Sequence, residues 1–72
     1  MSLSISGRNK LTGKIVAIEL GDIMALVTVQ VGEHLVDAVI TRRSAEELRL
    51  QVNDEVAALI KATEVMILKS SG

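Results

Sequence analysis

The 72-residue sequence contains no cysteine, phenylalanine, tryptophan, tyrosine or proline, and it has a single histidine. Without cysteine, the chain cannot form a disulfide or a thiolate metal site, and it has no thiol nucleophile. One histidine is too few for a His-rich transition-metal site within one chain. His34 is expected to be an exposed turn residue. We therefore expect no directly ligated metal and no enzymatic activity.

The sequence also lacks a strong charge of either sign, because 8 Lys and Arg residues face 9 Asp and Glu residues and give a formal net charge of −1. This balance provides no basic field for nucleic acid, and no aromatic side chain can stack on bases. Residues 1–10 contain no signal-peptide core, and no apolar run approaches the length of a membrane span. We expect a cytoplasmic protein with no nucleic-acid partner and no membrane partner.

What the sequence does contain is aliphatic bulk, since 49% of its residues are hydrophobic. A chain of this length forms one domain, expected to cover residues 1–72 with a core from 5 to 69. Domains this small bury only about 60% of the surface that the unfolded chain exposes, and they are marginal alone. More apolar residues than one small core can hold indicate burial between subunits, so we expect a homo-oligomer.

Short segments rich in apolar residues predict five strands, and a serine followed by glutamate three residues later predicts one helix. The first strand is expected to be largely buried on both faces, with a bulge or a close backbone contact at Gly13. The predicted elements are, in order, strands 11–20, 23–31 and 34–41, helix 44–50, and strands 55–61 and 65–69. This order predicts an all-β fold with one short helix, a five-stranded OB-like Greek-key barrel.

Polar residues interrupt the apolar pattern before the first strand, where Ser6, Gly7, Arg8 and Asn9 follow one another. They place a hydroxyl, a flexible glycine, a permanent positive charge and an amide within four positions. A loop so rich in hydrogen-bond donors, leading into a strand, is suited to an anion. The alternative is a solvated N-terminal tail.

Two further interruptions lie at the ends of predicted strands. Thr41 ends a strand and Ser44 begins the predicted helix, whose free N–H groups favour an anion. Lys61 ends the fourth predicted strand, and the next residue, Ala62, can offer its backbone N–H. Each position also has a purely structural interpretation: Ser44 as a helix cap, Thr41 as a strand residue, and Lys61 as a solvated strand end. Two carboxylates also count against an anion near the helix start unless they point away, namely Glu46 and Glu47.

Three motifs together resemble the molbindin (Mop) family of single TOBE-type domains. They are Ser6-Gly7-Arg8-Asn9-Lys10-Leu11 with Gly13, Ser44-Ala45-Glu46-Glu47-Leu48, and Ile60-Lys61-Ala62-Thr63 with Val65-Met66. The resemblance covers nearly the whole chain, with the motifs in the right order. It implies a strand-exchanged hexamer, a trimer of dimers, that binds molybdate or tungstate between subunits without a covalent cofactor.

Carried over by position, the resemblance implies a set of oxyanion-binding residues on two subunits. One subunit contributes Ser6, Arg8, Lys61 and the backbone of Ala62, and its neighbour contributes Thr41 and Ser44. Three residues are secondary candidates, namely Asn9, Arg42 and Thr63. The chain departs from the family pattern at Gly7, where alanine is commoner, and at Arg42-Arg43, where apolar or acidic residues are common.

The chemistry of the proposed ligand agrees with these residue types. Molybdate and tungstate are tetrahedral dianions that accept hydrogen bonds and cannot donate them near neutral pH, so their site needs donors and no carboxylate. The sequence thus predicts an oxyanion-binding protein for storage or homeostasis. An alternative is a regulatory or accessory TOBE domain of molybdate transport or of molybdate-responsive transcription. Storage is the expectation if the 72 residues are a complete gene product.

Overall fold

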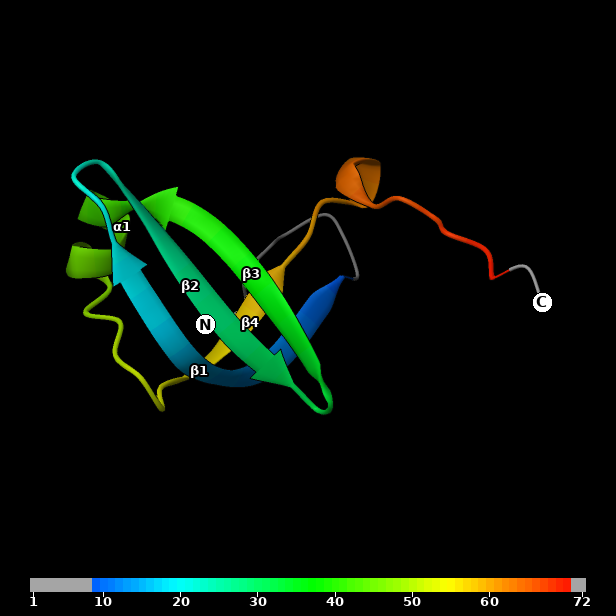
Figure 1. The fold of residues 1–72 in the computed structure, drawn as a ribbon, viewed down its shortest axis with the longest axis horizontal. Coiled ribbons are helices and arrows are strands. Elements are labelled where there is room, and N and C mark those ends of the chain that lie inside the picture. Colours follow the sequence, from blue (N-terminus) through cyan, green and yellow to red (C-terminus); the bar gives the residue numbers. More distant parts are fainter. Residues whose placement is uncertain (1–8, 71–72) are drawn as a thin grey trace, which may run out of the picture.

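The computed structural model describes residues 9–70, in which four antiparallel strands form one curled sheet in the order β3-β2-β1-β4 (Figure 1). Strands β1, β2 and β3 form a meander, and the chain then passes through a helix before β4 pairs with the free edge of β1. The elements are β1 (Lys10–Leu20), β2 (Met24–Val31), β3 (His34–Thr41), helix α1 (Arg42–Glu47), β4 (Glu55–Leu59) and the 3-10 turn η1 (Ala62–Glu64).

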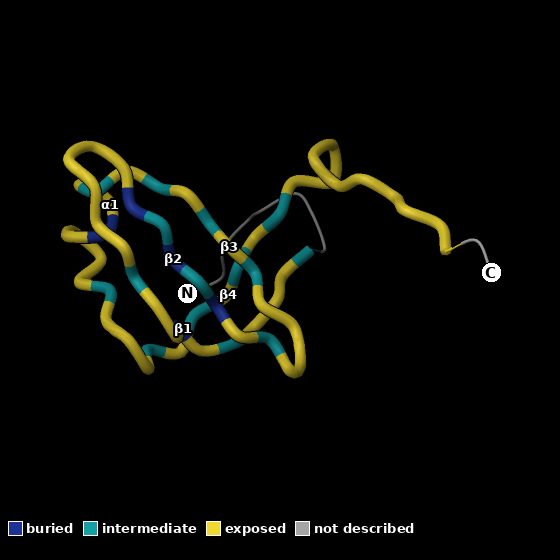
Figure 2. The backbone as a smooth tube through the Cα atoms, viewed as in Figure 1, coloured by how far each residue is buried: buried dark blue, intermediate teal, exposed yellow. Residues whose placement is uncertain are grey.

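A small core lies on the concave side of the curled sheet. Ile15 of β1 is fully buried against Val27 and Val29 of β2, where β-branched side chains suit the pleated surface. Figure 2 shows how few segments are buried. The partly buried side chains that pack around these three come from every strand and from the segment after α1, namely Ile18, Val31, Ile40, Leu50 and Val56.

The close backbone contact expected at Gly13 is present. A Cβ atom at Gly13 would collide with the backbone carbonyl of Gln30 on the neighbouring strand, and it would lie 3.0 Å from a methyl group of Val31. The pairing of β1 with β2 also shifts register between Ile15 and Ala17, as at a β-bulge. Glycine therefore lets the backbones of β1 and β2 approach closely at this position.

The fold is mostly β with one short helix, as predicted, but the expected fifth strand is wrong for the single chain. Residues 65–69 lie outside any strand and lead away from the sheet after η1 (Figure 1). Met66, Ile67 and Leu68 are each at least 90% exposed. A short apolar run becomes a strand only when it pairs with a sheet edge. Within residues 9–70, this segment has no such pairing.

The expectation that β1 would be buried on both faces is also wrong for the single chain. Ile15 is the buried residue of this strand, while Val16 and Leu20 are exposed. Nothing among the described residues covers the convex face of the sheet where β1 presents its other side chains. The apolar side chains of β1 predicted burial on both faces, and one chain thus leaves some of them uncovered.

The predicted helix is shifted by two residues, and its cap is not the predicted one. Helix α1 begins at Arg42, and its N-cap is Thr41, whose hydroxyl oxygen accepts a hydrogen bond from the Ser44 amide at 3.0 Å. Ser44 is therefore the third helical residue. The capping-box pattern misled because Thr41, three positions earlier, is also a suitable cap residue. The helix ends at Glu47, and Arg49 follows with a left-handed φ of 54°.

Candidate functional site

The predicted donors among residues 9–70 lie in two groups at opposite ends of β1. Thr41 stands opposite Met24 where β3 runs into α1, at the end of the sheet that contains the last residues of β1. Lys61 and Ala62 follow β4, whose last residue pairs with Lys10 at the start of β1. The eleven residues of β1 cover roughly 33 Å along the strand, so one chain keeps the two groups apart (Figure 1). A site that uses both groups needs two chains.

At the first of these ends, the hydroxyls of Thr41 and Ser44 are joined to each other. The Thr41 hydroxyl donates to the Ser44 oxygen at 2.8 Å, while the Thr41 oxygen accepts from the Ser44 amide. The pair therefore has one hydroxyl hydrogen left, on Ser44, because the other is used between them. The structure brings these two predicted residues together and leaves one donor to offer.

The start of α1 has fewer free amides than the sequence predicted. The Arg42 amide donates to the Ile23 carbonyl at 2.7 Å, and the Ser44 amide donates to Thr41. Two amides of the first helical turn are thus occupied. The hydroxyl of Ser44 is consequently a better donor candidate at this end than the helix start itself.

Arg42 and Arg43 are paired with the two glutamates that counted against an anion. The Arg42 Nε lies 3.3 Å from a Glu46 carboxylate oxygen, and a terminal nitrogen of Arg42 donates to the Gly21 carbonyl at 3.2 Å. Arg43 lies 3.3 Å from Glu47 on the solvent side of the helix. Arg42 thus links α1 to the turn between β1 and β2.

At the other end, Lys61 precedes η1 with extended backbone and an exposed side chain. Its carbonyl accepts from the Glu64 amide at 2.9 Å, and this bond closes the 3-10 turn. The Ala62 amide has no acceptor among residues 9–70. Thr63 is exposed in the same turn. Lys61, Ala62 and Thr63 therefore lie together, as their adjacency in the sequence requires.

Sequence reasoning gave no role to Glu64, which places an exposed carboxylate in the same short turn. Glu64 has no ion-pair partner within the described part of the chain, where Arg42–Glu46 and Arg43–Glu47 are the ion pairs present. A negative charge so close to Lys61 weakens the attraction of this end for anions unless the carboxylate points away. The signal was available in the sequence, since acidic residues favour the first turn of a helix.

Asn9 has a backbone role, because its carbonyl accepts from the Ile60 amide at 2.9 Å and extends the pairing of β1 with β4 by one step. Its side chain makes no hydrogen bond with another described residue. Ser6 and Arg8, the first two predicted ligands, lie outside the described residues.

Two hollows in the described part of the chain differ from the donor-rich site that the sequence predicts. The larger, of about 510 Å³, lies on the concave face and is lined chiefly by core side chains. Asp54 and Glu55 also line it. The other, of about 500 Å³, lies between the β1–β2 turn and α1 and includes Thr41, Arg42 and two acidic residues, Asp22 and Glu46. Carboxylates in each hollow oppose a dianion. Neither hollow by itself is an oxyanion site.

Neither a membrane-spanning helix nor a metal site is found within residues 9–70. No helix there is long and apolar enough to cross a membrane. No group of three or more histidine and acidic residues there is placed to hold a metal ion.

Comparison with known proteins gives consistent matches over nearly the whole chain. Residues 5–67 match the TOBE domain family. The chain is 42% identical to molybdenum-pterin-binding protein 1 of Clostridium pasteurianum over 67 residues, covering 92% of this chain and 98% of that protein. It is 39% identical to a probable molybdenum-pterin-binding protein of Haemophilus influenzae over 66 residues, covering 90% and 96%.

Solved structures give the same result for the fold. A molybdate-binding protein from Sporomusa ovata superimposes with a TM-score of 0.89 at 40% identity, covering 93% of this chain and 100% of that one. A longer relative also matches: the molybdenum transport protein ModE of Azotobacter vinelandii is 37% identical over 68 residues, which are 93% of this chain and 25% of that protein.

Proposed function

This chain belongs to the molbindin (Mop) family of single TOBE domains, and on that premise we propose that it binds molybdate or tungstate as an intact oxyanion. The observation that carries the proposal is the match along almost the full length to relatives named for binding molybdenum or molybdate. Binding without catalysis is part of the proposal, and it is supported by the names of these relatives, which describe binding proteins. We place the protein in the cytoplasm, with residues 1–72 as one domain and no covalent cofactor.

We propose a site formed by two subunits. One contributes Arg8, Ser6, Lys61 and the Ala62 amide, and the other contributes Thr41 and Ser44. The separation of the two groups along β1 supports this division, because a single chain does not bring them together. The Asn9–Ile60 hydrogen bond supports the first group, since Arg8 and Lys61 are the covalent neighbours of this joined pair. Asn9 and Thr63 are secondary candidates at the same end, and Arg42 is one at the other.

The donor types fit a dianion that accepts hydrogen bonds only. Arg8 and Lys61 carry positive charges, the Ala62 amide has no acceptor among residues 9–70, and Ser44 has a hydroxyl hydrogen left. Micromolar affinity corresponds to about −8 kcal/mol, and hydrogen bonds to a charged group contribute roughly 1.5–3 kcal/mol each. Four or five such bonds supply that affinity before the cost of ordering the loops.

We propose that the functional form is a homo-oligomer, a hexamer made of three strand-exchanged dimers. The exposed apolar residues Met66, Ile67 and Leu68 support this, because residues with such side chains are rarely left in water as a continuous run. Residues 65–69 also form a short apolar run of strand length but pair with no described strand, and exchange with a neighbouring chain would satisfy their backbone.

Storage or homeostasis of the anion is the role we propose. The alternative, a regulatory or accessory domain, is supported by the match to ModE, in which such a domain makes up a quarter of the protein. The two roles differ in a measurable way. A storage protein binds several anions per oligomer as an independent protein, while an accessory domain requires a transport or DNA-binding partner for its effect.

Native mass spectrometry of the 72-residue protein, with and without molybdate, tests the proposal directly. We expect an oligomer that gains a fixed number of molybdate ions, and calorimetry that gives micromolar or tighter affinity. Sulfate, also a tetrahedral dianion, is the control for a purely electrostatic interaction. A monomer that takes up no molybdate under either method would reject the proposed function.

A further inference from the structure

Lys10 is a basic residue of the β1–β4 ladder that the donor set leaves unused. It stands directly opposite Leu59 in the antiparallel register, and directly opposed residues carry their side chains on the same face of a sheet. Lys61 lies two residues after Leu59 and keeps extended backbone, with φ −63° and ψ 136°. Because side chains alternate with a period of two, Lys10 and Lys61 project from the same face.

The burial of the surrounding residues agrees with this assignment. Asn9 and Ile60, which lie next to these residues on the two paired strands, are half-buried, whereas Lys10, Leu59 and Lys61 are exposed. The 2.9 Å hydrogen bond from the Ile60 amide to the Asn9 carbonyl shows that pairing continues beyond the last residue of β4. The two lysines therefore lie on the outer face of one continuous ladder.

The two ammonium groups can reach a common ion. Opposed residues of antiparallel strands are about 5 Å apart and a two-residue step is about 7 Å, which places the two Cα atoms roughly 8 Å apart. Each four-carbon side chain is flexible enough to cover half of that distance. Neither Lys10 nor Lys61 has an ion-pair partner among residues 9–70, where the ion pairs join Arg42 to Glu46 and Arg43 to Glu47.

We propose that Lys10 is an affinity- and charge-selecting residue of the oxyanion site, contributing a second ammonium group beside Lys61. The inference rests on the proposed function and identifies a further determinant of the same site. A dianion gains twice as much from a nearby cation as a monoanion of the same shape. Lys10 therefore favours molybdate over a tetrahedral monoanion such as perrhenate, and it offsets the negative charge that Glu64 brings to this end.

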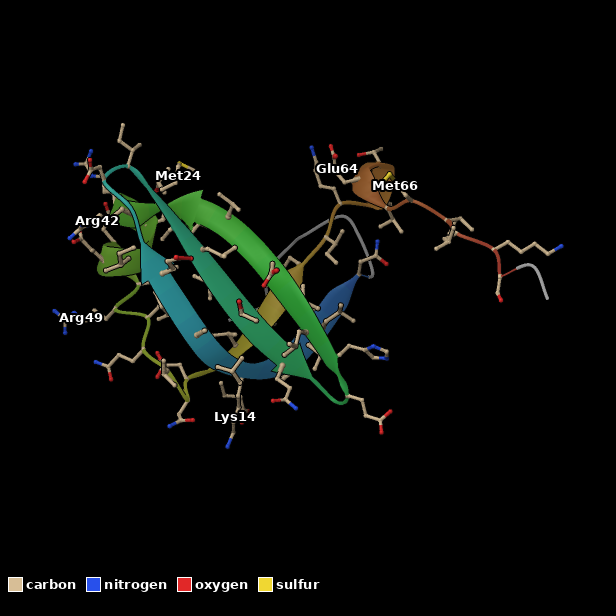
Figure 3. All side chains as sticks on the ribbon, in the orientation of Figure 1. Lys14, Met24, Arg42, Arg49, Glu64 and Met66 are labelled. Carbon is tan, nitrogen blue, oxygen red and sulfur yellow. The ribbon has the colours of Figure 1, made fainter. Side chains whose placement is uncertain are left out.

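The test compares K10Q with K14Q in the full 72-residue protein. Lys14 is the matched control because it lies on the same strand and the same face, about 13 Å farther along, and stands opposite Glu55 of β4. Figure 3 shows the Lys14 side chain pointing away from the region of Glu64 and Met66. Calorimetric titrations with molybdate and with perrhenate, in about 20 mM and about 0.5 M sodium chloride, separate charge effects from other losses.

We expect K10Q to weaken molybdate binding about five- to tenfold at low salt and about twofold at high salt, while K14Q stays within about twofold. Perrhenate binding should fall less than molybdate binding in K10Q, and K10R should retain the parent affinity. Equal effects of K10Q and K14Q, or no effect of K10Q while the parent protein binds molybdate, would overturn the role of Lys10 but not the proposed function. A parent protein that binds no molybdate would instead reject the proposed function and, with it, this inference.

Discussion

The hydroxyl groups of Thr41 and Ser44 lie 2.8 Å apart, and the Thr41 oxygen also accepts the Ser44 amide at 3.0 Å. This double contact gives different roles to two residues that were both proposed from the sequence as hydroxyl donors to the anion. Thr41 caps helix α1, and Ser44 retains the hydrogen that can be donated to a ligand. Stability and binding should therefore respond differently when each residue is changed.

Thr41→Ala should destabilise the protein by about 1 kcal/mol, because the Ser44 amide loses its acceptor, whereas Thr41→Ser should retain the cap. Ser44→Ala should change stability by less than about 0.5 kcal/mol but weaken molybdate binding by roughly 1.5–3 kcal/mol, since it removes a donor to a charged ligand. Thermal unfolding and calorimetry measure the two effects separately. Unchanged affinity in Ser44→Ala would remove this residue from the proposed site.

Arg8→Ala should weaken molybdate binding by roughly 2–5 kcal/mol, the scale for removing one partner of a buried charged pair. Arg43→Ala is the control, because Arg43 is an arginine whose exposed ion pair with Glu47 contributes little. Calorimetry at one salt concentration compares the two variants. Equal affinities in Arg8→Ala and the parent protein would reject Arg8 as a ligand.

The sequence predicted the first four strands in their order along the chain and one helix between the third and fourth, because these depend on local apolar patterns and turns. It misplaced the helix start, since Thr41 and Ser44 are both good caps and the choice between them depends on where β3 ends. It predicted a strand at 65–69 that one chain does not form, because a strand needs a partner edge and the pattern does not say which chain provides it.

The sequence proposes residue types for the candidate site but not their arrangement. The adjacency of Lys61 and Ala62 follows from the sequence alone, whereas their separation from Thr41 follows from the register of β1 with β2 and β4. Lys10 received no role in the sequence interpretation because only its pairing with Leu59 shows that it shares a face with Lys61. Pairing across strands is a long-range property that a linear pattern does not contain.

Gly13→Ala should destabilise the protein by about 2–3 kcal/mol, because the added methyl group would collide with the Gln30 backbone carbonyl, which cannot move without disturbing the sheet. Gly21→Ala is the matched control, since its Cβ would meet one carbonyl, that of Met24, at 3.2 Å. Denaturant unfolding of both variants measures the difference. Equal stabilities would mean that the close approach of β1 to β2 is not what requires glycine.

Arg49→Gly should stabilise the protein by up to about 1 kcal/mol. Arg49 has a φ of 54° just after the end of α1, where a side chain is strained and glycine is not. Asn53→Gly, at φ 81°, should have a smaller effect because asparagine tolerates the left-handed region better than arginine. Thermal unfolding at low protein concentration compares the two variants. A lower melting temperature for Arg49→Gly would indicate that the Arg49 side chain makes a stabilising contact that outweighs its backbone strain.

Ile67→Asp should dissociate the proposed oligomer while leaving the single-chain fold in place. The Ile67 side chain is 90% exposed in one chain, so a charge there costs the isolated subunit little. Burial in a neighbouring subunit would contribute roughly 1.5–3 kcal/mol per isoleucine, and a buried aspartate would reverse that gain.

Ser70→Asp, which adds the same charge just beyond the apolar run, is the control. Sedimentation should give a smaller mass for Ile67→Asp and the parent mass for Ser70→Asp, with similar circular dichroism. Equal masses for both variants and the parent would exclude this segment from the subunit interface.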